Sequence, residues 1–304
     1  MFDSAQQLVD GCPPLMLRCA CCDTRLSQQT SYCPECQTPA ELSRTVATRL
    51  GEQHFISILG ASNAGKTVYS GLLLDILSKG TDDFRGRATS AFSVDLQEQV
   101  ITALQRRTFP EKTASEADLW KWLHCQVTTR VKKNERHVDL ISPDFAGEAI
   151  ALEVNQPGMF PAIGDVVRKS RGVLILCDSL KVRDTGPGED LFAMKLAAYV
   201  AQAHGLAADG NRRIKPGGPA VAIVFTKSDA CPEARANPTE FAETNTPRLI
   251  EFCRQSFRQH AYFAASVAGS SGMLIDPRGR HMQVPFHVQP QGVVEPLRWI
   301  TDHF

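Results

Sequence analysis

The sequence predicts an α/β fold with a mostly parallel sheet, one antiparallel hairpin strand, helices on both faces, and a small cysteine-rich unit at the N-terminus. Apolar runs at 172–177 and 219–225 have the length of buried parallel strands, which are covered by helices on both sides. Residues 123–132 and 136–142 are predicted as two strands joined by a short polar turn, which indicates the hairpin. Most of the cysteines lie within the first 36 residues, so this segment is treated as a separate unit.

Two C-x-x-C pairs occupy the N-terminal unit, and their spacing predicts a zinc ribbon. A tetrahedral Zn²⁺ ion takes four thiolates, and a C-x-x-C turn lets two cysteines share the ion. The segment has few large apolar residues, so bound metal would supply its folding free energy. The predicted ligands are Cys19, Cys22, Cys33 and Cys36.

The ligand assignment has alternatives. Cys21 could replace Cys19 or Cys22, and Cys12 is interpreted as a bystander. Reduced or redox-active cysteines without metal would give the same pattern. A nucleic-acid partner is disfavoured because acidic residues outnumber basic ones in residues 1–45, and we expect a structural or protein-interaction module instead.

The boundary between the two predicted units follows from composition. Residues 38–49 are short on large apolar side chains and are predicted as a polar linker. We therefore expect two domains: 1–45, the zinc ribbon and linker, and 46–304, the α/β domain.

A phosphate-binding loop begins the second domain. A short apolar strand ending at Leu59 runs into G-x-x-x-x-G-K-T, and an apolar, helix-compatible run at 68–77 follows. Two glycines let backbone N–H groups point at phosphate oxygens, and the helix N-terminus adds partial positive charge. Lys66 would contact the β- and γ-phosphates, and Thr67 would bind Mg²⁺. A chance match in a glycine-rich turn is disfavoured by the flanking strand and helix. The loop residues are Gly60, Ala61, Ser62, Asn63, Ala64, Gly65, Lys66 and Thr67.

The chain then passes through an amphipathic helix at 93–107 and a polar loop at 108–113 to the hairpin. The second hairpin strand ends in Asp144-Phe145-Ala146-Gly147. An aspartate at the carboxyl end of a strand beside a phosphate loop is placed to hold Mg²⁺, usually through water. Gly147 could donate a backbone N–H to a γ-phosphate.

A base-selecting motif follows the strand at 219–225, where the sequence reads Thr226-Lys227-Ser228-Asp229. A carboxylate at Asp229 can accept hydrogen bonds from N1–H and the exocyclic amine of guanine, a donor pair that adenine lacks. The stem of Lys227 can lie over the purine face, and a plain charged loop is the alternative. The last strand is predicted at 262–267, where a backbone N–H of Ala265 or Ser266 could reach the guanine oxygen.

The C-terminal segment contains a region rich in Gly and Pro at 269–291, predicted as a long loop, and a closing helix at 293–304. Composition adds limits on partners. The formal net charge is zero and no apolar run approaches the roughly 20 residues of a membrane span. Because the N-terminus has acidic Asp3 and no apolar signal core, we expect a cytoplasmic protein without a membrane partner.

From His54 onward the chain resembles the small P-loop GTPases of the translation-factor-related class, which includes Ras-like proteins. The motifs that carry the resemblance occur in order: G60-x-x-x-x-G65-K66-T67, D144-x-x-G147, T226-K227-x-D229 and the Ala265–Ser266 region. A zinc ribbon before such a domain resembles the bacterial double-GTPase families. This resemblance implies a companion GTPase as a partner.

Three positions depart from the family pattern or extend it. Glu148 occupies the place of the glutamine that orients the attacking water, and its carboxylate would repel a γ-phosphate. The switch threonine that binds Mg²⁺ is not obvious, with Thr113 the first choice and Thr108 the second. Asn63 matches the asparagine of K⁺-activated GTPases, and a tolerated surface asparagine is the alternative.

These observations predict a GTP-binding switch, a hydrolase with slow Mg²⁺-dependent turnover that K⁺ or a partner could stimulate. Its expected ligands are GTP or GDP, Mg²⁺, Zn²⁺ and, as a candidate, K⁺. The catalytic candidates are Lys66, Gly147, Glu148 and Asn63. The alternative is a catalytically weak scaffold that holds nucleotide and recruits partners through the ribbon.

Overall fold

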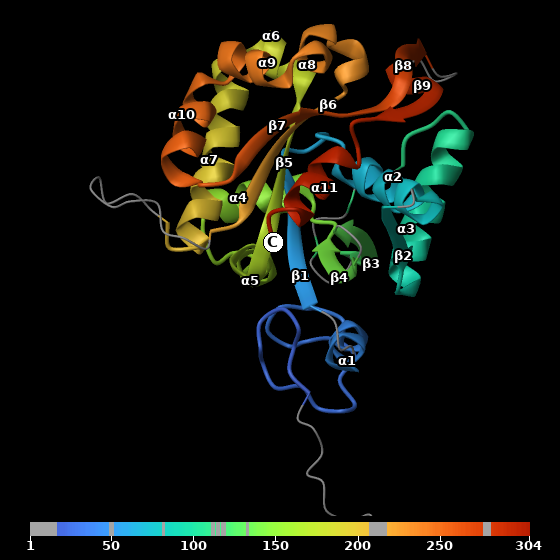
Figure 1. The fold of residues 1–304 in the computed structure, drawn as a ribbon, viewed down its shortest axis with the longest axis vertical. Coiled ribbons are helices and arrows are strands. Elements are labelled where there is room, and N and C mark those ends of the chain that lie inside the picture. Colours follow the sequence, from blue (N-terminus) through green and yellow to red (C-terminus); the bar gives the residue numbers. More distant parts are fainter. Residues whose placement is uncertain are drawn as a thin grey trace, which may run out of the picture.

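The structure is a computed structural model of the 304-residue chain, and it describes residues 17–48, 52–80, 83–110, 113, 116, 120–131, 134–206, 218–275 and 281–304. Its centre is a seven-stranded sheet of order β2-β3-β4-β1-β5-β6-β7 (Figure 1). The strands are β1 (Glu52–Gly60), β2 (Phe84–Ala88), β3 (Trp122–Val131), β4 (Asn134–Pro143), β5 (Ser170–Asp178), β6 (Ala220–Thr226) and β7 (His260–Ala264).

Strand directions confirm the predicted fold class. Strands β4, β1, β5, β6 and β7 are parallel to one another, and β3 is antiparallel to both β4 and β2. The β3–β4 pair is the predicted hairpin, with Trp122 opposite Pro143 and Val131 opposite Asn134. The carboxyl ends of the parallel strands therefore meet at one edge of the sheet, where the predicted motifs lie.

Helices cover both faces of the sheet because the buried strands are apolar on both sides. In β5, Val173 and Ile175 pack into one core, whereas Leu174 and Leu176 pack into the other. The first face is covered by α4 (Gly147–Asn155), α5 (Pro161–Lys169), α6 (Ser179–Thr185), α7 (Pro187–Ala203), α8 (Pro232–Ala236), α9 (Pro238–Asn245) and α10 (Pro247–Ser256). The second face is covered by α2 (Lys66–Lys79), α3 (Ala91–Gln105) and α11 (Glu295–Thr301), and the short helix η2 (Ser228–Ala230) follows β6.

The prediction of a long loop at 269–291 is wrong. The segment forms a hairpin of β8 (Ser266–Ile275) and β9 (His281–Gln291), separate from the main sheet. Glycine and proline suggested a loop, but a two-stranded ribbon tolerates proline where no ladder hydrogen bond is needed. The register of this hairpin shifts near Ser270, which hides the period-2 alternation. The strand predicted at 262–267 is also shorter, because β8 begins at Ser266.

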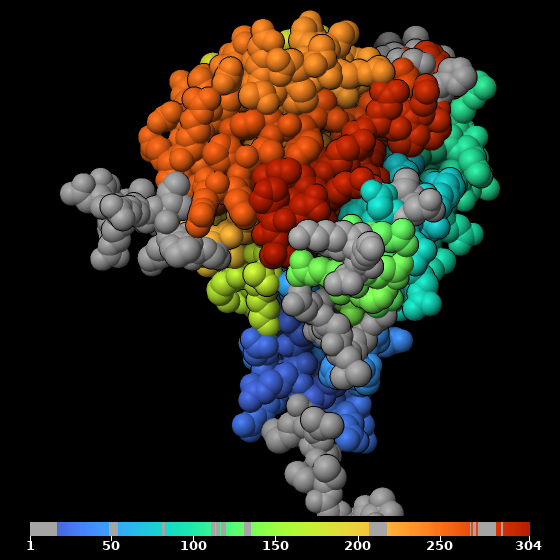
Figure 2. All heavy atoms as spheres, viewed as in Figure 1, coloured from blue at the N-terminus to red at the C-terminus, as the bar shows by residue number. Residues whose placement is uncertain are grey.

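The N-terminal unit packs against the α/β domain through α1 (Ala40–Thr48) and α5. Residues 38–49 were predicted as a polar linker, but α1 forms there and buries Leu42 and Val46 in the core that contains the cysteines. Lys169 holds the unit by donating to the carbonyl of Ala20 at 3.0 Å and pairing with Asp23 at 2.8 Å. Figures 1 and 2 show the unit (blue) extending from the amino end of β1, away from the carboxyl ends of the strands. Among the described residues, no helix combines the length and apolarity needed to cross a membrane.

Candidate functional site

The phosphate loop joins β1 to α2, as the motif predicts. Gly65 has φ +86° and is the residue before the helix, a left-handed conformation that favours glycine. At Gly60 a Cβ atom would lie 2.6 Å from the carbonyl oxygen of Leu176, so only glycine allows β1 to approach β5 this closely. Asn63 also has positive φ, +66°, which asparagine adopts more readily than most residues. This backbone requirement explains an asparagine at 63 without a bound K⁺ ion.

Lys66 is buried beneath the loop and donates to two loop carbonyls, Gly60 at 3.1 Å and Ala61 at 3.0 Å. Burial lowers the pKa of its ammonium group to about 8, although the charges of Asp144 and Glu148 raise it. The ammonium group therefore lies inside the loop, within reach of a phosphate group bound there.

Three oxygen-bearing side chains meet at the start of α2. The hydroxyl of Thr67 lies 2.8 Å from that of Thr113 and donates to Asp144 Oδ2 at 2.9 Å. Thr113 also donates to Asp144 Oδ2 at 2.9 Å. Burial raises the pKa of Asp144, opposed by the hydrogen bonds from both threonines and by Lys66. Two hydroxyls and a carboxylate are hard donors that fit Mg²⁺.

The second threonine candidate lies elsewhere. Thr108 donates to the carbonyl of Ala103 at 3.1 Å, so it closes the end of α3 and is not recorded in contact with Asp144. The structure therefore places Thr113, the first choice from sequence, beside Thr67.

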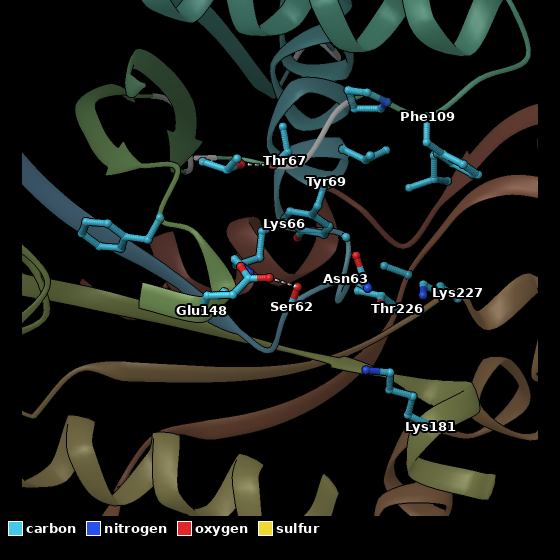
Figure 3. A pocket seen from close by; sticks show the side chains of 18 of the residues that line it. Ser62, Asn63, Lys66, Thr67, Tyr69, Phe109, Glu148, Lys181, Thr226 and Lys227 are labelled. Carbon is cyan, nitrogen blue, oxygen red and sulfur yellow. Dashed lines mark hydrogen bonds between the residues drawn. The ribbon is translucent and has the colours of Figure 1, made fainter. Parts of the chain in front are cut away.

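The D-x-x-G segment contacts the phosphate loop directly. A Cβ atom at Gly147 would lie 2.4 Å from the backbone nitrogen of Ser62, so the absence of a side chain allows this contact. Glu148, at the start of α4, accepts a hydrogen bond from the hydroxyl of Ser62 at 2.6 Å (Figure 3). The Glu148 carboxylate, which was predicted to face the γ-phosphate, is thus hydrogen-bonded to the phosphate loop.

The base-selecting motif begins at the end of β6. Thr226 donates to the carbonyls of Ala64 at 3.0 Å and Cys177 at 3.2 Å, which ties the motif to the phosphate loop. Asp229 accepts a hydrogen bond from Ser266 at 3.1 Å. Backbone bonds between Ala265 and the β6 end, Ala265 N to Phe225 O at 2.8 Å, place the predicted 265–266 region against this motif.

Sequence reasoning missed Asp178, which orders the same region. Its Oδ2 pairs with Lys227 at 2.5 Å, and its Oδ1 caps α6 by accepting from the amides of Leu180 and Lys181. Asp178 is 5% exposed. Its place at the carboxyl end of a buried strand, like that of Asp144, was the signal that could have identified it.

These elements surround one cavity of about 390 Å³, a volume typical of small-molecule sites. Figure 3 shows Lys181 approaching it from α6. Gly60, Ala61, Ala64, Asp144 and Ser266 of the predicted set are not among its lining residues. Lining residues from the prediction are Ser62, Asn63, Gly65, Lys66, Thr67, Thr113, Gly147, Glu148, Thr226, Lys227, Asp229 and Ala265, and those that were not predicted include Val68, Tyr69, Phe109, Pro110, Phe145, Lys181 and Val267.

The N-terminal cysteines form a second candidate site. The sulfurs of Cys19, Cys22, Cys33 and Cys36 all lie within 4.8 Å of one another. Four thiols at this spacing fit a tetrahedral Zn²⁺ ion.

The two C-x-x-C turns have matching backbones. Asp23 N donates to Cys19 O and Gln37 N donates to Cys33 O, both at 3.0 Å. Asp23 and Gln37 both have positive φ, so each turn closes behind its second cysteine in the same way.

Cys21 is not one of the four clustered cysteines. Its sulfur lies 3.9 Å from the carbonyl oxygen of Ala162 in α5, so it contacts the α/β domain, and it also lies near the Cys36 thiol, whose pKa it raises. Cys12, interpreted as a bystander, lies outside the described residues.

This arrangement predicts the metal content of cysteine variants. Replacing Cys19, Cys22, Cys33 or Cys36 by serine should remove zinc, because each supplies one of four ligands. Cys21→Ser is the matched control and should keep about one zinc per chain, as should the unchanged protein. Metal analysis of the purified variants checks this. Loss of zinc from Cys21→Ser, with retention in Cys22→Ser, would contradict the assignment.

One family model and two solved structures are similar to this chain. Residues 57–197 match the family model described as DO-GTPase1, Double-GTPase 1. The chain is similar to the Arl6 BBS3 small GTPase from Trypanosoma brucei with bound nucleotide analogue GppNp, at 14% identity and TM-score 0.39, over 83% of this chain and 96% of that chain. It is also similar to a bacterial selenocysteine-specific elongation factor, EF-Sec, at 13% identity and TM-score 0.33, over 71% of this chain and 26% of that chain. No curated protein matches the chain.

The family match contains the phosphate loop and the D-x-x-G segment, whereas the base-selecting motif at 226–229 lies beyond it. The resemblance to double GTPases found in the sequence is confirmed by this match. Residues 57–197 of the chain therefore resemble the Double-GTPase 1 family.

Proposed function

We propose that this protein is a GTP-binding switch that hydrolyses GTP slowly and with Mg²⁺. One observation carries the proposal: Thr67, Thr113 and Asp144 meet beside a cavity that the base-selecting motif also lines. A magnesium-ligand set, a phosphate loop and a base-selecting carboxylate on one cavity together fit Mg²⁺-bound guanine nucleotide.

We further propose that 1–45 and 46–304 act as two domains. We also propose a cytoplasmic location, where buried thiols such as Cys177 remain reduced.

Each part of the site has a role in this proposal. Backbone amides of 61–67 and Lys66 bind the phosphates, and Lys66 exchanges its loop carbonyls for phosphate oxygens, which are stronger acceptors. Asp229 accepts from guanine while Lys227 lies along the purine. Mg²⁺, when bound, supplies positive charge to the β- and γ-phosphate oxygens. Contacts to the γ-phosphate order the segments near Thr113 and Gly147, and its loss releases them.

Glu148 is the reason to propose slow hydrolysis. Its carboxylate is held 2.6 Å from Ser62 and, when ionised, accepts hydrogen bonds but donates none. It cannot stabilise negative charge that develops on the phosphate, and its own charge opposes it. Positive charge from a K⁺ ion beside Asn63, or from a partner such as a companion GTPase, would offset this effect.

The Ser62–Glu148 hydrogen bond also favours a second function, an interaction scaffold. In that case nucleotide holds the domain in one shape, Glu148 reflects lost catalysis, and the zinc ribbon recruits the partner. The ribbon extends from the far end of the sheet, where it is accessible without disturbing the nucleotide cavity (Figure 1).

Single-turnover hydrolysis separates the two functions. A switch should release phosphate from bound GTP in the presence of Mg²⁺, with faster release in K⁺ than in Na⁺ if K⁺ acts at Asn63. Asn63→Gly keeps the positive φ at 63 while removing the side-chain amide, so it should abolish any difference in phosphate release between K⁺ and Na⁺. Absence of phosphate release in every salt, with GTP still bound, would leave the scaffold.

Thr113→Ala tests the magnesium site. Removing one oxygen donor should raise the Mg²⁺ concentration needed for half-maximal GTP binding at least about tenfold, or about 1.4 kcal/mol. Thr108→Ala is the matched control, because the Thr108 hydroxyl bonds to Ala103. Fluorescent GTP binding measured against Mg²⁺ concentration gives the comparison. An equal response of both variants would exclude Thr113 as the switch threonine.

Asp229→Asn tests the base site. The amide can donate to the 2-oxo group of xanthine and loses the acceptor that guanine needs, so GTP affinity relative to XTP should fall by roughly a hundredfold. The variant should fold, because an asparagine oxygen can still accept from Ser266. Calorimetric titration with GDP and XDP measures the change. A variant that still prefers GDP would show that Asp229 does not select the base.

A further inference from the structure

A second cavity, of about 370 Å³, lies at the opposite end of the sheet from the nucleotide cavity. It is formed where α5 joins β5, where α10 leads toward β7, and next to the start of β6. Its described lining residues are Arg168, Lys169, Ser170, Arg171, His204, Leu206, Gly218, Pro219, Ser256, Phe257, Arg258, Gln259 and His303.

The described lining of this cavity contains four permanently cationic side chains and no carboxylate. Two of the cations have acidic partners, since Arg168 pairs with Asp165 at 2.6 Å and Lys169 pairs with Asp23 at 2.8 Å. Arg171 and Arg258 form no ion pair with any described residue. The whole chain has equal numbers of acidic and basic residues, so this is a local excess of positive charge.

Ser256 adds a polar group to the wall of the cavity. Its side chain lines the cavity, and the residue is 5% exposed. Its hydroxyl is not among the fully buried polar atoms that lack a partner, so it is accessible from the cavity, where it can donate a hydrogen bond to a ligand oxygen.

Helix ends explain only part of the charge. Basic side chains in the last turn of a helix offset the partial negative charge of its carbonyls, and Arg168 and Lys169 occupy the last turn of α5. Arg171, however, lies within β5, and Arg258 lies beyond the end of α10.

The shape and charge of the cavity define the class of ligand. Guanidinium groups match phosphate oxygens in a paired hydrogen-bond geometry. The enclosed volume suits a compact group, and a chain of zero net charge offers little to an extended nucleic acid. We infer that this cavity binds a small phosphorylated molecule, with Arg171, Arg258 and Ser256 contacting the phosphate.

Pyrophosphate titrated calorimetrically into GDP-loaded protein tests the inference, because GDP occupies the phosphate loop. The same titration into Lys66→Ala protein removes the loop as a binding site independently. Both preparations should bind pyrophosphate. Because the Lys66→Ala arm needs no GTP or GDP binding, a failure of the proposed GTP switch leaves this test interpretable.

Three variants identify the contacts, with one matched control. Arg171→Gln and Arg258→Gln should each weaken pyrophosphate binding about tenfold or more, since each removes a charged hydrogen bond. Ser256→Ala should weaken it several-fold without loss of fold, checked by circular dichroism. Arg254→Gln is the control, because Arg254 lies on α10, pairs with Glu243 at 3.0 Å and is not among the lining residues.

Binding that is lost in Arg258→Gln and Arg171→Gln but kept in Arg254→Gln supports the site. Equal weakening in Arg254→Gln would show a nonspecific charge effect and overturn the inference. So would the absence of pyrophosphate binding in both GDP-loaded and Lys66→Ala protein.

Discussion

The structure depends on close backbone contact around the phosphate loop. At Gly60 the loop lies against the carbonyl of Leu176 in β5, and at Ser62 its backbone lies against Gly147, which follows β4. The hydroxyl of Thr226 at the end of β6 reaches the loop carbonyl of Ala64. The ends of three neighbouring strands therefore converge on one loop, and this is possible because glycine leaves no Cβ in two of the contacts. The proposed magnesium ligands, the T-K-x-D motif and Glu148 all lie around that convergence.

The two ends of the sheet have different chemistry. At the carboxyl ends, buried Lys66 and Asp144 are close enough to influence each other's pKa, and burial opposes the charged form of both. At the amino ends, Lys169 holds the N-terminal unit, and the cationic cavity that it lines lies beside that unit. The parallel strands separate the two cavities, so a ligand in one would not occupy the other.

Much of the fold was predictable because its signals are local. The buried strands at 172–177 and 219–225 and the hairpin at 123–142 appear in the structure with small shifts at their ends. The errors lie where tertiary contacts override composition. Residues 269–291 pair as a hairpin despite their glycines and prolines, and the supposed linker forms α1 because Leu42 and Val46 find a core to bury in. The short edge strand β2 was missed since its pairing with β3 is long-range.

The phosphate loop, the D-x-x-G and T-K-x-D motifs and the two C-x-x-C pairs are recognisable from sequence, because each motif places its chemistry within a few neighbouring residues. Which distant residues join them depends on the tertiary structure. In the structure Thr113, and not Thr108, lies beside Thr67, and Asp178 lies beside Lys227. It also left Cys21 out of the cluster of four cysteines and placed its sulfur against α5. These contacts depend on how strands and helices that are far apart in the sequence pack together, and residue spacing alone does not predict that packing.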